Sequence, residues 1–306
     1  MQRSARVITA LLSLLCATVQ AAQNSDKRQT RFSAEVAIGA EYDSNVAIDE
    51  LDTSSSKSDN ALTLDADLSL KTALSEHTEL NLSYDFSQNI YQDFGELNRQ
   101  THILGTSIEQ DFERIDTGLS LFYISSLLDG DSFLTLYRIS PSLSGFIGKK
   151  WFGRSALVYS DKSLEQNSDR DAQTHTVELD LYYFARGLRS YINVGYRYKD
   201  ENAEAEHYDY GSNGIKLRYI HRFELPSRTL KLELAWRYED RHYRHDTPAI
   251  NRKRSDQRQR WQLDVEIPIL KNSAVQLYSS YGNYDSNYWP ADYDQLVTGS
   301  RFIHRW

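Results

Sequence analysis

The sequence has little sulfur and no long apolar segment beyond its first residues. Of 306 residues, one is cysteine, one is methionine and 5 are proline. The cysteine, Cys16, falls within the apolar run of a predicted export signal, so removal of that signal leaves no thiol for a disulfide or a cysteine-ligated metal site. After residue 21, no stretch approaches the roughly 20 apolar residues of a membrane-spanning helix. These absences exclude a disulfide-stapled domain and a helical membrane protein.

The first 21 residues have the pattern of a cleaved export signal. Arg3 and Arg6 form a basic head, residues 7–19 are apolar, and Val19-Gln20-Ala21 is a small-residue cleavage site. Residues 22–29 then form a predicted short periplasmic segment. The whole chain carries 35 Lys and Arg against 43 Asp and Glu, and loss of the signal makes it more acidic. Such acidity argues against a nucleic-acid partner.

Strand-favouring residues are abundant, with 21 Tyr and an aromatic content of 12%. From residue 30 onward, apolar and polar residues alternate with a period of two. Leu62 and Leu64, for example, alternate with Thr63 and Asp65. This alternation gives a strand one apolar and one polar face, which predicts an all-β fold.

Alternating runs follow one another along the whole chain. Fourteen begin near Thr30, Ala61, Glu79, Thr101, Asp116, Phe133, Trp151, Gln173, Leu188, Ser212, Thr229, Gln257, Ala274 and Asp294. Tight turns alternate with longer polar connections, of which Asp43 to Asp59 is the longest and His245 to Lys253 is another. An even strand number, with short turns at one end and longer loops at the other, is typical of a transmembrane β-barrel. We predict an antiparallel up-and-down transmembrane barrel of about 14 strands over residues 30–306.

A soluble β-sandwich also alternates, and strand length separates the two architectures. The runs reach about 10 to 14 residues, close to the roughly 9 to 11 that a tilted strand needs to cross a bilayer. Aromatic residues expected at the lipid–water boundary lie at run ends: Tyr42, Tyr91, Trp151, Tyr198, Tyr243, Tyr284 and Trp306. In the last run, Gly299, Phe302 and Trp306 resemble the signal read by the barrel-assembly machinery of Gram-negative bacteria. The predicted location is the bacterial outer membrane, with its lipid and that machinery as partners.

If the apolar faces contact lipid, the alternate side chains face the lumen, and many of these are charged. Strands two to four provide a predicted acidic wall of Asp65, Asp67, Asp85, Glu109 and Asp111. Strands nine to eleven provide a predicted basic wall of Arg189, Arg197, Lys199, Lys216, Arg218, Arg222, Lys231 and Arg237. The two walls would lie on roughly opposite sides and set a transverse field across a wet lumen. Alternatively, the charges pair with neighbours on adjacent strands and merely solvate the wall.

Residues that could carry chemistry are dispersed. The 8 histidines lie on different strands and turns, and no Ser-His-acid cluster can be assigned by spacing. His242 and His245 lie near a long connection without a third metal ligand at familiar spacing, which favours a solvated loop. The tetrapeptide Tyr-Asp-Ser-Asn occurs at residues 42–45 and 284–287, where a turn is favoured over a calcium site. We predict no enzyme activity, catalytic residue, metal or cofactor.

Three segments of the alternating pattern carry a family resemblance: Glu41-Tyr42-Asp43-Ser44-Asn45-Val46, Tyr84-Asp85-Phe86-Ser87-Gln88-Asn89-Ile90-Tyr91-Gln92-Asp93-Phe94 followed by Gln100-Thr101-His102, and the closing run 297–306. They resemble the barrel domain of the surface lipoprotein assembly modifier family. The resemblance covers residues 30–306 and implies a fourteen-stranded barrel that helps to move lipoproteins or small soluble proteins to the cell surface. That family usually carries a periplasmic domain of helical repeats before the barrel, whereas only residues 22–29 separate the predicted cleavage site from the first strand.

The sequence therefore predicts a monomeric barrel with a polar transmembrane path. The leading hypothesis is a channel or export pore related to that family, with an exported protein or lipoprotein as its client. One alternative is a passive porin for small charged solutes. The other is a structural or adhesive surface barrel whose lumen is plugged.

Overall fold

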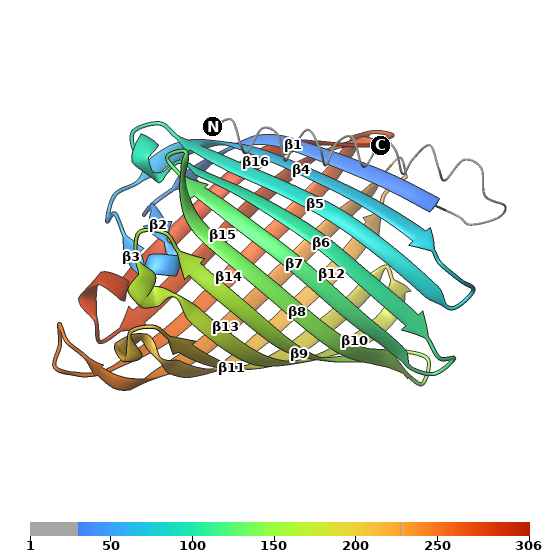
Figure 1. The fold of residues 1–306 in the computed structure, drawn as a ribbon. Coiled ribbons are helices and arrows are strands. Elements are labelled where there is room, and N and C mark those ends of the chain that lie inside the picture. Colours follow the sequence, from blue (N-terminus) through green and yellow to red (C-terminus); the bar gives the residue numbers. More distant parts are fainter. Residues whose placement is uncertain (1–29, 227) are drawn as a thin grey trace, which may run out of the picture.

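The computed structural model describes residues 30–226 and 228–306, which form a closed barrel (Figure 1). Fourteen antiparallel strands pair with their neighbours in sequence, and the first strand closes the barrel against the last. The predicted all-β, up-and-down barrel is confirmed. The predicted export signal (1–21) and the segment 22–29 lie outside the described residues. No helix in the described ranges has the length and hydropathy needed to span a membrane.

The barrel strands are β1 (Thr30–Asp43), β4 (Asp59–Ala73), β5 (Thr78–Tyr91), β6 (Arg99–Asp111), β7 (Asp116–Leu128), β8 (Asp131–Ile147), β9 (Trp151–Leu164), β10 (Ala172–Leu188), β11 (Ser190–Ala203), β12 (Tyr210–Glu224), β13 (Thr229–Thr247), β14 (Arg252–Leu270), β15 (Ser273–Ser286) and β16 (Tyr293–Arg305). A separate two-stranded sheet consists of β2 (Ala47–Ile48) and β3 (Thr53–Ser54). Short 3-10 helices lie in the connections: η1 (Asp49–Leu51), η2 (Gly95–Leu97), η3 (Ser168–Arg170), η4 (Glu206–Tyr208) and η5 (Trp289–Ala291).

The barrel has two different ends. At the short-turn end, tight turns follow β4, β6, β8, β10, β12 and β14, and β1 begins and β16 ends there. At the opposite, long-loop end lie the connections after β1, β5, β9, β11 and β15, each of which contains a 3-10 helix. The connection after β7 lies at the same end but consists only of Asp129 and Gly130, with φ of 51° and 82°. Positive φ at both positions matches the twist of a two-residue hairpin turn.

Several strands are longer than the sequence predicted, reaching 19 residues in both β13 and β14. The predicted long loop from His245 to Lys253 is wrong, because these two strands pair as far as Thr247 and Arg252. Pairing resumes there after a register irregularity between His242 and Asp246. β13 and β14 therefore extend further at the long-loop end, and their extended part carries several residues of the candidate site.

Side chains alternate between the outside and the interior of the barrel. On the outside, Ile38, Leu62 and Leu157 are 60%, 61% and 63% exposed. Next to them in sequence, Ala37 and Thr63 point inward and are 3% and 7% exposed. The barrel therefore presents its apolar side chains outward, which is the arrangement that hydrocarbon surroundings stabilise.

The aromatic residues at the run ends do not all face lipid. Tyr42, Trp151, Tyr198 and Trp306 are 40%, 43%, 42% and 64% exposed, in agreement with the prediction. For Tyr243 and Tyr284, the prediction is wrong, because they are 5% and 8% exposed and line the interior. Tyr91 also lies on the inner side, since it pairs with the inward Ala61. The outer boundary therefore holds fewer of these rings than predicted.

Candidate functional site

The first long connection, residues 44–58, folds back toward the barrel interior, and we call it the inward hairpin. Figure 1 shows its strands β2 and β3 within the long-loop end. The amide of Asn45 donates to Asp43 Oδ1 at 2.9 Å, which forms the turn that the Tyr-Asp-Ser-Asn tetrapeptide predicted. The Ser55 amide then donates to the Val46 carbonyl at 2.8 Å and closes the hairpin. Asp52 follows η1 in the left-handed region, with φ 52° and ψ 45°.

The hairpin packs apolar side chains against a distant part of the wall. Ile48 and Leu51 contact a small buried cluster of Phe133, Leu134 and Leu164 on β8 and β9. Those strands lie on the far side of the barrel from β1 and β4, between which the hairpin is inserted. Each methylene buried in this contact stabilises the inward position by about 0.8 kcal/mol.

Asp52 is the main polar anchor of the inward hairpin. It is 5% exposed, and Arg170, Arg254 and Arg258 lie 3.0, 3.1 and 2.5 Å from its carboxylate oxygens. Arg241 lies 3.7 Å away. Burial by itself would raise the pKa of Asp52, but the four guanidinium groups outweigh it and hold that pKa well below its ordinary value. The carboxylate is therefore charged and joins β13, β14 and η3 to the hairpin.

A second layer of contacts supports this arginine cluster. Arg254 is 2% exposed and donates to both oxygens of Asp256, at 2.8 and 2.7 Å. Its guanidinium lies 4.7 Å from the ring centre of Tyr243 and 5.2 Å from that of Tyr288. Ser286 donates to Asp256 at 2.6 Å. Each buried charge has a partner of opposite sign or an aromatic face. These contacts offset the free-energy cost of removing the charges from water.

The hairpin also reaches other parts of the circumference. Glu50 accepts from Arg99 on β6 at 2.5 and 3.2 Å. On β16, the Tyr293 hydroxyl donates to Asp49 at 3.3 Å. Lys57 lies 5.8 Å from the ring centre of Phe94, in the connection after β5. With contacts on so many sides, residues 44–58 narrow the long-loop end.

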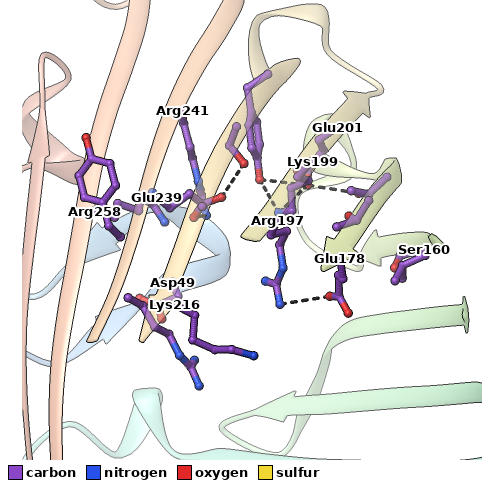
Figure 2. Close-up of a pocket in the computed structure, with 18 of the residues that line it drawn as sticks. Asp49, Ser160, Glu178, Arg197, Lys199, Glu201, Lys216, Glu239, Arg241 and Arg258 are labelled. Carbon is purple, nitrogen blue, oxygen red and sulfur yellow. Dashed lines mark hydrogen bonds and ion pairs between the residues drawn. The ribbon is translucent and has the colours of Figure 1, made fainter. Parts of the chain in front are cut away.

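Below the hairpin, the wall encloses a charged cavity of about 590 Å³. It is lined by Asp49, Glu50 and Asp52 of the hairpin and by inward residues of β8 to β15. Ten Arg and Lys line it against seven Asp and Glu, although the whole chain has a net charge of -8. Arg197 and Glu178, directly opposite each other on the neighbouring strands β11 and β10, form an ion pair of 3.2 Å along the cavity wall; Figure 2 marks this pair with a dashed line. The cavity is thus more basic than the protein that encloses it.

Most residues of the predicted basic wall form ion pairs with nearby Asp and Glu side chains. Ion pairs join Arg189 to Glu224 (3.1 Å), Arg197 to Glu178 (3.2 Å), Lys199 to Glu201 (3.4 Å), Lys216 to Asp180 (2.7 Å), Arg218 to Glu233 (2.5 Å) and Lys231 to Glu233 (3.2 Å). Arg222 donates to the Leu188 carbonyl. Arg189 lies in the turn between β10 and β11. Arg197 and Arg218 pair with carboxylates on the adjacent strand, as in the alternative prediction, whereas Lys199 and Lys231 pair within their own strands and Lys216 reaches from β12 to β10. Arg237 has no ion pair among the described residues.

The predicted acidic wall occupies inward register positions on β4, β5 and β6. Asp65 pairs with Arg301 at 2.8 Å. Asp67 lies directly opposite Asp85, whereas Glu109 and Asp111 lie toward the short-turn end. This wall and the basic cavity are on different sides of the barrel.

Residues 22–282 match the surface lipoprotein assembly modifier family. The chain belongs to this family. No curated protein matches the sequence. Among solved structures, the outer membrane channel DcaP of Acinetobacter baumannii has a TM-score of 0.55 at 10% identity, covering 92% of this chain and 98% of that one. The anion-selective porin from Comamonas acidovorans has a TM-score of 0.54 at 10% identity, covering 92% of this chain and 100% of the porin. At such identities the likeness shows the fold alone, which is that of an outer-membrane barrel.

The three residues of the predicted assembly signal, Gly299, Phe302 and Trp306, do not all face the same side of the barrel wall. Phe302 and Trp306 are 44% and 64% exposed. Gly299 faces inward on β16, where an added Cβ would lie 2.5 Å from the Tyr278 hydroxyl. The glycine thus gives room for that tyrosine, whose hydroxyl donates to Glu41 at 2.8 Å. Recognition by the assembly machinery stays a prediction.

The histidines singled out from the sequence lie on β13, not in a loop. His242 lies 3.1 Å from Asp240, and His245 lies 3.8 and 3.9 Å from Glu206 and Asp209. Across residues 30–226 and 228–306, no group of three potential ligands is placed to hold a metal ion.

The residues that hold the hairpin were not identified from the sequence: Asp52, Arg170, Arg241, Arg254 and Arg258. One signal was available, because Arg254, Asp256, Arg258 and Arg260 share one face of the alternating run in β14. That pattern places several charges together inside the barrel. It does not show that a loop carboxylate, about 200 residues earlier in the chain, completes the cluster.

Proposed function

We propose that the chain forms a polar conduit across the bacterial outer membrane, narrowed at the long-loop end by the inward hairpin. The observation that carries this proposal is the charged cavity below the hairpin, enclosed by a barrel whose outer surface is apolar. Charged side chains on the inner face keep a lumen hydrated and suit the passage of polar material. By analogy with other outer-membrane barrels, the long-loop end faces the cell exterior and the short-turn end the periplasm.

Family membership supports an export role, with a lipoprotein or small protein as client. The conduit acts as a monomer, and the barrel-assembly machinery inserts it into outer-membrane lipid. The proposed conduit performs no chemistry itself, and most of the charged groups of its lumen are engaged in ion pairs.

A second candidate function is a surface barrel with a permanently closed lumen. The contacts of the inward hairpin with β6, β8, β13, β14 and β16 favour it. The two functions differ in whether the hairpin leaves a path for ions. A passive porin for small charged solutes would share that path but lack a client.

Planar-bilayer recording of the purified protein distinguishes these functions. The conduit predicts discrete ion-conducting steps. Replacing residues 47–54 with a Gly-Ser linker of equal length removes the contacts made by Ile48, Leu51 and the acidic side chains Asp49, Glu50 and Asp52, and should enlarge the steps. A control exchanging Lys149 and Lys150 for serine, in the turn after β8, should conduct as the wild type does. If neither the wild type nor the linker variant conducts, the conduit is wrong and a closed barrel is supported.

The export role needs a measurement in cells. Surface lipoproteins of the native host are labelled with a membrane-impermeant biotin reagent, with the protein present or deleted. Loss of a lipoprotein from the labelled fraction on deletion, with its total amount unchanged, supports export. An unchanged labelled set together with normal conductance supports a passive porin.

A further inference from the structure

Two arginines face the cavity without a carboxylate partner. Arg237 on β13 and Arg260 on β14 are directly opposite each other in the strand register, and both side chains are exposed to the lumen. Arg260 donates to the Ser280 hydroxyl at 3.2 Å. Among the described residues, no carboxylate lies within the 4.0 Å of an ion pair from either guanidinium. Most other Arg and Lys side chains that line the cavity do form an ion pair with a carboxylate.

The position of the two arginines concentrates positive charge. Lys216 on β12 lies directly opposite Arg237, so three basic residues occupy one row across β12, β13 and β14. Lys216 is compensated by Asp180 at 2.7 Å, which leaves two uncompensated charges in the row. Like charges directly opposite each other in a sheet destabilise it. An anion between the guanidinium groups would offset that repulsion.

The surroundings of the row reinforce the preference for an anion. Glu233, the carboxylate whose charge acts on Arg237, already has Arg218 and Lys231 at 2.5 and 3.2 Å. It is therefore saturated and leaves the arginine row free to act on solutes. Guanidinium groups bind phosphate and carboxylate oxygens through paired N–H donors. Low-dielectric walls strengthen this attraction further.

We infer that Arg237 and Arg260 form an anion-binding site in the lumen, for a solute that carries a phosphate or carboxylate group. The site deepens the proposed conduit, because it gives the path a preferred class of charge. Binding itself does not require an open path, since the cavity is part of the folded barrel. The cavity of about 590 Å³ has room for a small organic anion as well as for inorganic phosphate.

Inorganic phosphate and acetate are suitable probes, titrated separately into the detergent-solubilised protein at constant ionic strength in chloride. Phosphate binding is followed by broadening of its phosphorus NMR signal, and acetate binding by saturation-transfer NMR. Exchanging Arg237 and Arg260 together for glutamine should weaken binding about tenfold or more, since it removes the charge-assisted hydrogen bonds of both guanidinium groups. The matched control exchanges Lys149 and Arg186 for glutamine, both exposed at the short-turn end, and should bind as the wild type does.

Single exchanges and the pair Arg237→Lys with Arg260→Lys keep the test decisive if the double glutamine variant misfolds. Folding is checked by the altered gel mobility of an unheated barrel. Lysine retains charge but not the paired donors, so phosphate affinity should fall less than with glutamine. Binding that is absent in the wild type, or equal in all folded variants, overturns the site. Binding without bilayer conductance would uphold the anion site and refute the conduit. Conductance without binding would uphold the conduit and refute the anion site.

Discussion

Asp52→Asn is expected to release the inward hairpin. The substitution keeps the shape of the side chain but removes a charge that is 5% exposed among four guanidinium groups. Removing one partner of a buried ion pair costs about 3–5 kcal/mol, because the remaining charges are left uncompensated. The substitution destabilises the inward position of the hairpin relative to the released one, because Asp256 still pairs with Arg254 and Arg258 after the hairpin leaves. The ratio of inward to released hairpin should fall by roughly a hundredfold or more.

Two assays report this release. Lys57 is exposed next to the anchored segment, so a released hairpin should be cut there by trypsin much faster than in the wild type. Single-channel recordings should show larger or more frequent openings. Asp49→Asn is the matched control, because the Asp49 side chain is exposed and, among the described residues, its carboxylate accepts one hydrogen bond, from the Tyr293 hydroxyl. If Asp52→Asn and Asp49→Asn are cut and conduct alike, Asp52 does not hold the hairpin.

Three further changes test other parts of the structure. Because the pKa of Asp52 lies well below its ordinary value, Asp52 stabilises the inward hairpin fully above about pH 4, and this stabilisation is lost only as the pH falls through the lowered pKa. Channel opening in the wild type should therefore not increase between pH 8 and pH 5, and an increase that is absent from Asp52→Asn would contradict this. Replacing Arg197, Arg218 and Arg237 with glutamate should shift the reversal potential in a KCl gradient toward cation preference, and an unchanged potential would contradict a lumen lined by these residues. Leu157→Arg on the outer face should destabilise the barrel in lipid by about 2–4 kcal/mol in urea titrations, and a loss equal to that of Leu157→Met would count against lipid contact there.

The barrel could be predicted from the sequence because its information is local. Alternation with a period of two marks each strand and its two faces, as in Leu62 and Thr63, and closure follows from the need to pair every edge in hydrocarbon. The same alternation, applied at the strand ends, would have placed Tyr243 and Tyr284 inside the barrel. Their aromatic character suggested the membrane boundary, but the side of the strand decides the direction of a side chain.

The candidate site could be predicted only in part, because its contacts join distant segments. Inward charges such as Arg197 and Lys216 were identified, but their partners depend on the register between strands. The inward hairpin left no local signal, since its polar residues are also typical of an exposed loop. Asp52 acquires its role from arginines on η3, β13 and β14 that only the closed barrel brings together.

A watery interior and a lipid-facing exterior predict opposite reactivity for adjacent residues on β10. Thr176 lines the cavity, whereas Val177 is 38% exposed on the outer face. The only native cysteine, Cys16, lies in the predicted export signal, so Thr176→Cys and Val177→Cys each introduce one thiol into the processed chain. In lipid vesicles, a small charged thiol reagent should modify Cys at position 176 and leave Cys at position 177 unmodified. Equal modification of both positions, or modification of position 177 alone, would show that the barrel does not have a watery interior and a lipid-facing exterior.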